Sequence, residues 1–279
     1  MHFGFGDSRG RAAAARGVSR MTDQLNLYQP LALFVPNSAG DSAALLDLTL
    51  QAVHQTFPFL NHLLQVLGKE PPLVVGIDQF PTDDAGRGTA RRLASAFDRF
   101  GSDKSSGRDY HLLYGEILKN PEAVSCVLEI GLGTNHLDVV SNMGAQGRPG
   151  ASLRAFRECL PNAVILGADV DTRVLFEEER IRTHHVDQTD LASFESLGRH
   201  VPDAVDLIID DGLHSPNANL AVLAFAVGRL KVGGWLVVED IPERAIPFWN
   251  VVAALLPDTF AGNLVRAKGA LAFALRKNL

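Results

Sequence analysis

Apolar side chains recur every three to four residues over positions 42–68, and this spacing predicts an α-helix. Pro58 lies inside the pattern and should break or kink the helix, because proline has no amide hydrogen to donate. A second helix is predicted over 88–101, where Gly101 ends the apolar pattern. These helical patterns precede the first clear strand, so the N-terminal third of the chain is expected to form a helical cap.

From about residue 125 onward, short β-rich runs alternate with helical patterns. The strand runs are residues 126–131, 163–170, 180–186, 205–210 and 234–241. Two further β runs near the C-terminus are joined at Lys268 and Gly269, which is typical of a hairpin. This alternation predicts an α/β fold with a Rossmann-like, mostly parallel seven-stranded sheet that ends in an antiparallel hairpin.

The composition is that of an ordinary globular protein, with 46% hydrophobic and 21% charged residues. The net charge is -6 and no basic stripe is present, so we expect neither a nucleic-acid partner nor an anionic membrane surface. No apolar run reaches the roughly 18 residues of a membrane span. The two cysteines, Cys126 and Cys159, lie in apolar contexts and are expected in the core, as in a cytoplasmic protein.

A glycine turn follows the first strand run, where Glu129 precedes Gly131 and Gly133. Glycines at the end of such a strand let a ligand approach the backbone closely. The dinucleotide fingerprint would require another glycine three residues after Gly133, but His136 stands there. The turn therefore favours a nucleoside ligand other than a nicotinamide dinucleotide.

Acidic and amide side chains follow the next two strand runs. Asp169 stands where an acid would reach ribose hydroxyls, and Asp187 and Gln188 are suited to an adenine edge. No lysine or arginine follows the glycines to hold a phosphate. An adenosine without phosphate points to S-adenosylmethionine.

The glycine turn and Asp169 are separated by more residues than a compact βαβ unit needs. The extra length lies in residues 135–152, which are rich in glycine and polar side chains. This insertion is interpreted either as a lid over the cofactor or as a passive surface loop.

Two pairs of acids end neighbouring strand runs. Asp210 and Asp211 end one run, and Glu239 and Asp240 end the next. Carboxyl ends of parallel strands meet at one edge, so these carboxylates should converge and repel each other unless a cation joins them. We predict Mg²⁺, or another hard divalent ion, bound by Asp211, Glu239 and Asp240. Asp210 is expected to turn inward, to cap a helix or to face the cofactor.

His214 lies three residues after Asp211, across a glycine. An imidazole can accept a proton near neutral pH, so beside a metal site His214 is the predicted general base, with Asp211 as its catalytic partner.

These motifs resemble those of class I S-adenosylmethionine-dependent methyltransferases, and in particular the metal-dependent sugar O-methyltransferases of macrolide and related pathways. The resemblance rests on "GSDKSSGRDYHLLY", "VLEIGLGTN", "GASLRAF", "GADVD", "VDQTD", "IIDDGLH" and "GGWLVVED". It implies an O-methyltransferase that acts on a hydroxyl of a small molecule, such as a sugar moiety or a natural-product intermediate.

The resemblance also implies roles for individual residues. Asp211, Glu239 and Asp240 match metal ligands, and His214 matches the general base. The cofactor contacts that it implies are Glu129, Gly131, Asp169 and Asp187. The residues that match a segment closing over the methionine end of the cofactor are Ser102, Asp103, Lys104 and Tyr114.

The expected organisation is a disordered arm at 1–20, a helical cap at 21–100 and a methyltransferase domain at 101–279. An apolar cap of this kind often packs against a second subunit, so a homo-oligomer is possible. Three alternatives remain open: a metal-independent N-methyltransferase, an NAD-binding oxidoreductase, and a non-catalytic nucleoside-binding protein on the same fold.

Overall fold

The computed structural model describes residues 29–37 and 41–278. These residues fall into two compact units, of which the first ends at Lys69 and the second begins at Glu70. The expected arm at 1–20 lies outside the described residues. The methyltransferase domain is expected from residue 101 onward, and the second compact unit begins at Glu70 and so also contains residues 70–100. The reason is that α3 (Asp84–Phe100) packs in the second unit, where Phe97 meets the ring of Phe156 edge-on with 5.3 Å between centroids.

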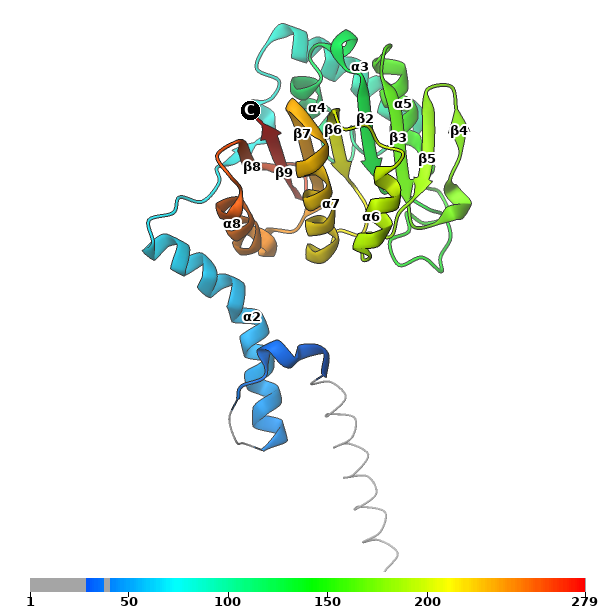
Figure 1. Ribbon diagram of the computed structural model, residues 1–279. Helices are drawn as coiled ribbons and strands as arrows, with labels where there is room; N and C mark the ends of the chain where they lie inside the picture. Colours follow the sequence, from blue (N-terminus) through cyan, green and yellow to red (C-terminus); the bar gives the residue numbers. More distant parts are fainter. Residues whose placement is uncertain (1–28, 38–40, 279) are drawn as a thin grey trace, which may run out of the picture. The chain divides into compact units, whose positions relative to one another are not determined.

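The first unit consists of η1 (Gln29–Phe34) and the long helix α2 (Ser42–Val66) (Figure 1). Asp41 caps α2 by accepting hydrogen bonds from the amides of Ala43 and Ala44 at 3.0 Å. Of the break or kink expected at Pro58, the break does not occur, and the helix continues through the proline. One missing amide removes one intrahelical hydrogen bond, and the turns on both sides keep theirs.

The second unit is built on one nine-stranded sheet with the order β1-β8-β9-β7-β6-β2-β3-β5-β4. The strands are β1 (Val74–Gly76), β2 (Cys126–Ile130), β3 (Val164–Asp169), β4 (Glu177–Glu178), β5 (Ile181–His185), β6 (Val205–Asp210), β7 (Leu230–Ile241), β8 (Phe260–Arg266) and β9 (Leu271–Lys277). The expected mostly parallel sheet with a C-terminal antiparallel hairpin is confirmed. Two short edge strands, β1 and β4, extend the seven expected strands to nine.

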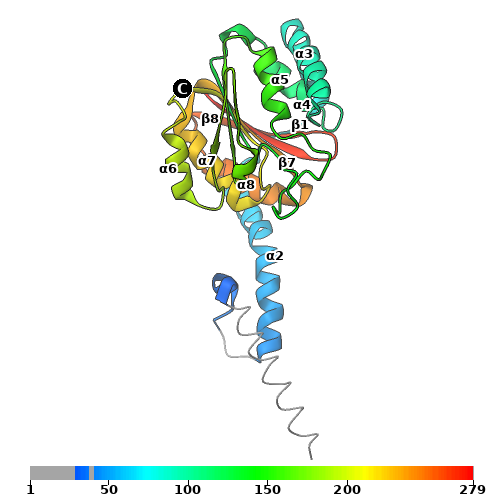
Figure 2. The same cartoon turned by 90° about the vertical axis from the view of Figure 1, so that its right-hand side faces the viewer.

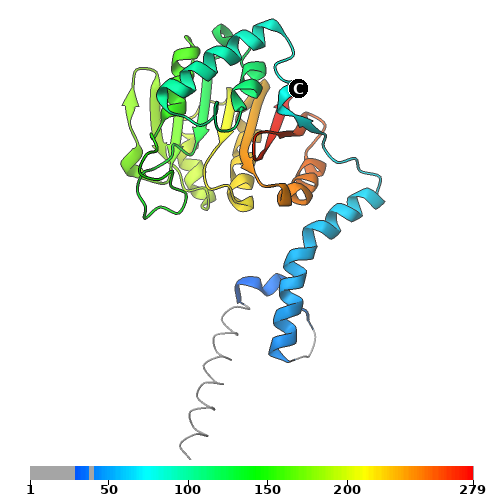
Figure 3. The ribbon, with the colours of Figure 1, turned by 180° about the vertical axis from the view of Figure 1, so that it is seen from behind.

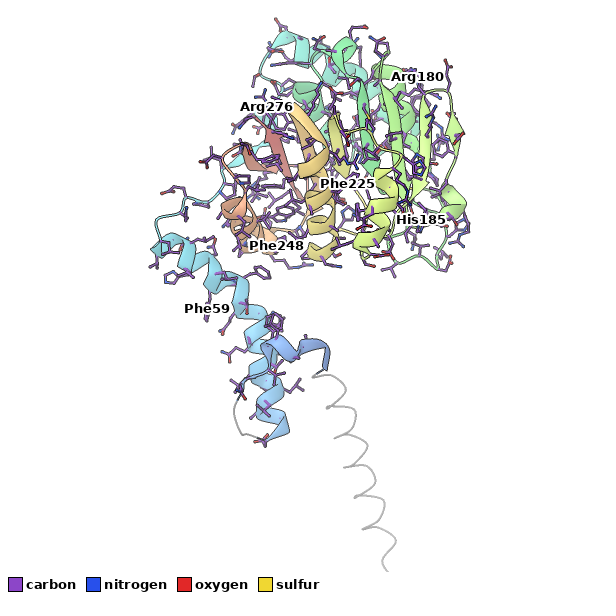
Figure 4. The ribbon with its side chains drawn as sticks, in the orientation of Figure 1. Phe59, Arg180, His185, Phe225, Phe248 and Arg276 are labelled. Atoms are coloured by element: carbon purple, nitrogen blue, oxygen red, sulfur yellow. The ribbon has the colours of Figure 1, made fainter. Side chains whose placement is uncertain are left out.

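Helices cover both faces of this sheet (Figures 1 and 2). On one face lie α3, α4 (Tyr110–Ile117) and α5 (Ala151–Cys159). Figure 3 turns the molecule by 180° from the view of Figure 1, so that this face is toward the viewer. On the other lie α6 (Leu191–Gly198), α7 (Pro216–Arg229) and α8 (Ile246–Leu255), with Phe225 and Phe248 labelled in Figure 4. Short 3₁₀ turns complete the unit: η2 (Ile77–Gln79), η3 (Pro121–Ala123), η4 (Thr172–Val174) and η5 (Glu243–Ala245).

Alternate strand residues therefore enter two separate cores. Val127 packs toward α3, α4 and α5, whereas its neighbour Leu128 packs toward α6, α7 and α8. Both cysteines are buried and free, as expected for core residues, and burial raises the pKa of the Cys126 thiol to about 12. Among the described helices, none combines the length and apolar character that crossing a membrane would require.

The order of the strands positions the candidate site. Along the chain, β2 is followed by β3 and β5 on one side, and by β6 and β7 on the other. The connections diverge at the carboxyl ends of β2 and β6, and ligands of open α/β sheets bind at such a point.

Candidate active site

The glycine turn after β2 leaves no room for side chains. Gly131 has φ +96°, and a Cβ there would lie 2.1 Å from the carbonyl oxygen of Asp211. Gly133 has φ +74°, and a Cβ there would meet the Met143 side chain at 2.3 Å. Both positions favour glycine because of the left-handed backbone, and Gly131 also needs it because the backbone of the loop after β6 approaches closely.

Replacing Gly131 with alanine should therefore destabilise the fold by at least about 1–3 kcal/mol. Gly228→Ala is the matched control, because nothing lies within 4 Å of a Cβ at that position of α7. Chemical denaturation compares the two variants. If Gly131→Ala is as stable as Gly228→Ala, the turn is not sterically closed.

A cavity of about 230 Å³ opens beside this turn. Its apolar wall consists of Ile130, Val139, Val140, Val170, Val186 and Leu213. Five residues that the sequence analysis assigned to the cofactor line it: Gly131, Gly133, Asp169, Asp187 and Gln188. An apolar slot with a few polar groups at one rim suits a nucleoside.

Two of these polar side chains are also used within the protein. The Asp169 carboxylate accepts hydrogen bonds from the amides of Leu132 and Asp171, both at 2.8 Å. The Gln188 side chain donates to Asp210 and accepts from the Leu213 amide, again at 2.8 Å. These bonds hold the loops that form the cavity, so the two side chains shape the rim as well as line it.

Asp210 faces α7 rather than the cavity. It is fully buried and accepts hydrogen bonds from Gln188 and Asn219 at 2.8 Å. Burial raises the pKa of this carboxyl, while the bonds from Asn219 and Gln188 oppose the shift. The inward orientation that the sequence analysis left open is the one observed, and Asp210 reaches the cavity only through Gln188.

The acid pair at the end of β7 lies on one face of the sheet because the strand bulges. Glu239 points toward α4, and regular alternation would turn Asp240 to the opposite face. Instead the register with β9 shifts between Val238 and Ile241, and Asp240 has φ +54°. Both carboxylates consequently face α4, which is a common use of a bulge near a functional site.

Lys104 lies at the centre of the acids. Its ammonium is buried and lies 2.6 Å from Asp211 Oδ2, 2.6 Å from Glu239 Oε2 and 3.1 Å from Glu129 Oε1. Burial disfavours the charged ammonium, but Asp211, Glu239 and Glu129 outweigh it and raise the pKa of Lys104 well above its ordinary value. Lys104 is therefore a charged group that holds three carboxylates together.

Glu239 and Glu129 each accept one further hydrogen bond. Tyr114 donates to Glu239 Oε1, and Ser152 donates to Glu129 Oε2 at 2.5 Å. Burial raises the pKa of Glu239 well above its usual range, and Lys104 opposes that shift.

Asp240 is held by two residues that the sequence analysis did not single out. Tyr110 donates to Asp240 Oδ1 at 2.9 Å, and Arg108 donates to Oδ2 at 3.2 Å. Burial and the nearby acids Glu239 and Asp240 raise the pKa of the Tyr110 hydroxyl. Tyr110 and Tyr114 are four residues apart on α4, and that spacing is the signal that could have identified Tyr110.

Asp211, His214 and Asp240 form a group that fits a metal ion. One ligand atom from each lies within 4.8 Å of the others. His214 Nε2 is 3.7 Å from Asp211 Oδ1, and among the described residues nothing hydrogen-bonds its buried Nδ1. His214 also has φ +51°, an uncommon conformation for a side-chain-bearing residue. Oxygen-rich sites of this type suit hard divalent ions.

Of the three predicted metal ligands, two belong to this group and the third, Glu239, does not. Asp211 and Asp240 are in the group, but the two oxygens of Glu239 are bonded to Lys104 and Tyr114. Glu239 could join an ion only if Lys104 or Tyr114 released one of its oxygens. The imidazole of His214 takes its place in the group, although the sequence analysis assigned it to proton transfer.

A second cavity of about 400 Å³ adjoins the first, and both are lined by Gly131, Gly133, Ser141 and Asp211. The second is also lined by His214 and Asp240. The insertion at residues 135–152, interpreted from the sequence either as a lid or as a passive surface loop, contributes residues to both cavities. Its Ser141 hydroxyl donates to the Gly212 carbonyl at 2.8 Å. The two cavities thus adjoin each other beside Asp211.

The fold is that of S-adenosylmethionine-dependent methyltransferases. MycE methyltransferase from the mycinamycin biosynthetic pathway, solved in complex with Mg and SAH, superposes with a TM-score of 0.54 and 21% identity. The superposition covers 67% of this chain and 55% of that one. The same enzyme solved with Mg, SAH and mycinamycin VI gives a TM-score of 0.54 and 22% identity, over 67% and 54% of the two chains.

In sequence the chain resembles sugar O-methyltransferases of natural-product pathways. It is 29% identical over 179 residues to 8-demethyl-8-alpha-L-rhamnosyl tetracenomycin-C 2'-O-methyltransferase of Streptomyces olivaceus, which covers 63% of this chain and 44% of that protein. It is 33% identical over 93 residues to mycinamicin VI 2''-O-methyltransferase of Micromonospora griseorubida, over 33% and 23% of the two chains. The chain thus spans less than half the length of these curated relatives. No protein-family model matches it.

Proposed function

We propose that this protein is an S-adenosylmethionine-dependent O-methyltransferase that methylates a hydroxyl of a small molecule, a sugar moiety or a natural-product intermediate. The observation that carries the proposal is the position of Asp211, His214 and Asp240 in a cavity that adjoins the nucleoside-sized slot. The relatives' names support an oxygen acceptor on a sugar. They also make the metal-independent N-methyltransferase the less favoured alternative.

Asp211 and Asp240 would hold a Mg²⁺ ion, and the imidazole of His214 would stay off the ion so that it can accept a proton. When bound, such an ion would supply positive charge that stabilises a deprotonated hydroxyl of the acceptor. The chain's own residues do the rest. Lys104, Tyr110 and Arg108 hold the carboxylates in position, and the two adjoining cavities bring donor and acceptor together.

His214 is the proposed general base. Its ring lines the second cavity and lies beside Asp211, whose carboxylate would stabilise the protonated imidazole. The methyl group is already activated on the sulfonium, so removal of the acceptor's proton and in-line positioning are the tasks left to the protein.

Replacing His214 with alanine is expected to lower the turnover number by about 10²-fold while S-adenosylhomocysteine binding is preserved. Steady-state methyl transfer and calorimetric titration measure the two effects. His185→Ala is a matched control, because this exposed histidine at the end of β5 lines neither cavity. A turnover number within threefold of the wild type would remove His214 from proton transfer.

Ligand-induced thermal stabilisation tests the proposed function as a whole. S-adenosylhomocysteine should raise the melting temperature and NAD should not. Addition of Mg²⁺ should restore methyl transfer to a rhamnosylated tetracenomycin-type acceptor after EDTA treatment. Stabilisation by NAD alone would favour the oxidoreductase alternative, and cofactor binding without any Mg²⁺ response would favour a non-catalytic nucleoside-binding protein.

A further inference from the structure

Arg148 lines the second cavity. Its positive charge is opposite to that of most other ionisable groups in the lining. The acids in that lining are Asp103, Asp211 and Asp240. The other lysine or arginine in the lining is Lys104, which is fully engaged with three carboxylates. Arg148 is exposed, and within residues 41–278 no protein hydrogen bond or ion pair engages its guanidinium, which leaves it available to a ligand in the cavity.

The backbone makes room for this side chain. Arg148 reaches from the end of the inserted loop across Gly101, the residue that ends α3 with φ +85°. A Cβ at Gly101 would lie 2.8 Å from Arg148 Cδ and 3.3 Å from its Nε. A side chain at position 101 would therefore displace Arg148 from the cavity wall.

A second feature of the same wall favours negative charge. Ala151 and Ser152, the first residues of α5, line the cavity beside Arg148. The amino end of a helix carries partial positive charge, which adds to that of the guanidinium. Elsewhere the lining contains three acids, and the charge of Lys104 is taken up by carboxylates, so an anionic ligand group would meet the least repulsion at this wall.

We propose that Arg148 binds a carboxylate of a ligand in the second cavity. A guanidinium presents two parallel N–H donors that match the two oxygens of a carboxylate. This proposal rests on the proposed function, under which two ligands could supply the carboxylate. They are the amino-acid part of S-adenosylmethionine and an acidic sugar acceptor. The chemistry is the same in both, and an experiment with two arms separates them.

The first arm compares S-adenosylhomocysteine with 5'-methylthioadenosine, which has the same nucleoside and thioether but no amino-acid group. If the donor supplies the carboxylate, Arg148→Gln should weaken binding of S-adenosylhomocysteine about tenfold and leave methylthioadenosine binding unchanged in calorimetric titration. Arg148→Lys, which keeps the charge but not the paired donors, should fall between Arg148→Gln and the wild type.

The second arm titrates the protein with D-glucuronate and with methyl glucoside, a neutral sugar with the same ring. If the acceptor supplies the carboxylate, the wild type should bind glucuronate, and Arg148→Gln should lose that binding. Arg182→Gln, an exposed arginine outside both cavities, is the control in both arms.

Unchanged affinity of Arg148→Gln for S-adenosylhomocysteine, together with glucuronate binding that does not depend on Arg148, would overturn the proposal. Failure of the proposed function looks different. In that case the wild type would bind neither S-adenosylhomocysteine nor methylthioadenosine, and the glucuronate arm alone would decide the role of Arg148.

Discussion

Replacing Asp211 with asparagine is expected to lower the rate of methyl transfer by about 10³-fold and to abolish its dependence on Mg²⁺. Asp211 belongs to the candidate metal group, and its Oδ2 lies 2.6 Å from the Lys104 ammonium. Asparagine keeps the shape of the side chain but removes its charge. A hard cation is then held by one carboxylate fewer.

The nucleoside slot should survive this change, because the part of Asp211 nearest the glycine turn is its backbone carbonyl. Calorimetry should therefore find the affinity for S-adenosylhomocysteine within about threefold of the wild type. Asp258→Asn, an exposed carboxylate after α8, is the control. Methyl transfer by Asp211→Asn that still responds to Mg²⁺ would place the ion elsewhere.

Replacing Lys104 with methionine is expected to destabilise the fold by about 3–5 kcal/mol, because it leaves buried carboxylates without their cation. Glu129 and Glu239 are almost wholly buried, so neither can recover hydration without a rearrangement. Chemical denaturation measures the loss. Lys119→Met is the matched control, since Lys119 forms exposed ion pairs with Asp83 and Glu116 and its loss should barely change stability.

Two further measurements separate charge from packing at Lys104. The double variant Lys104→Met/Glu239→Gln should be less destabilised than the sum of the single variants, because one unpaired charge is gone. Mg²⁺ should stabilise Lys104→Met more than the wild type if Glu239 is a metal ligand, since the ammonium no longer competes. Additive losses and no Mg²⁺ response would mean that Lys104 does not organise the acids.

The cavity-lining residues after β2 and β3 could be predicted because parallel strands end at one edge of their sheet. Each apolar strand run ends in a polar or glycine residue, and that local change of pattern is visible without any tertiary contact. The same reasoning brought Asp211 and Asp240 together correctly. It could not show that Gln188 and Asp210 bond to each other beneath the cavity, because that contact joins two strand ends across the sheet.

The orientation of the side chains within the acid cluster could not be predicted from the local pattern of apolar and polar residues. A strand pattern assigns alternate residues to opposite faces, and a bulge adds one residue to that count. The bulge in β7 turns Asp240 toward Tyr110, and only the pairing with β9 reveals it. The domain boundary was equally inaccessible, because the apolar face of α3 fits a separate cap as well as the sheet unit to which it belongs.

The sequence by itself determined the alternating α/β architecture, the glycine turn and the presence of acids and a histidine at one edge, since these follow from neighbours along the chain. The tertiary structure decided which charges meet. Lys104 is 107 residues from Asp211 and 135 from Glu239, and its burial among them is visible only in the folded chain. A buried charge depends on whatever surrounds it in space, and that surrounding is assembled from segments that sequence patterns treat separately.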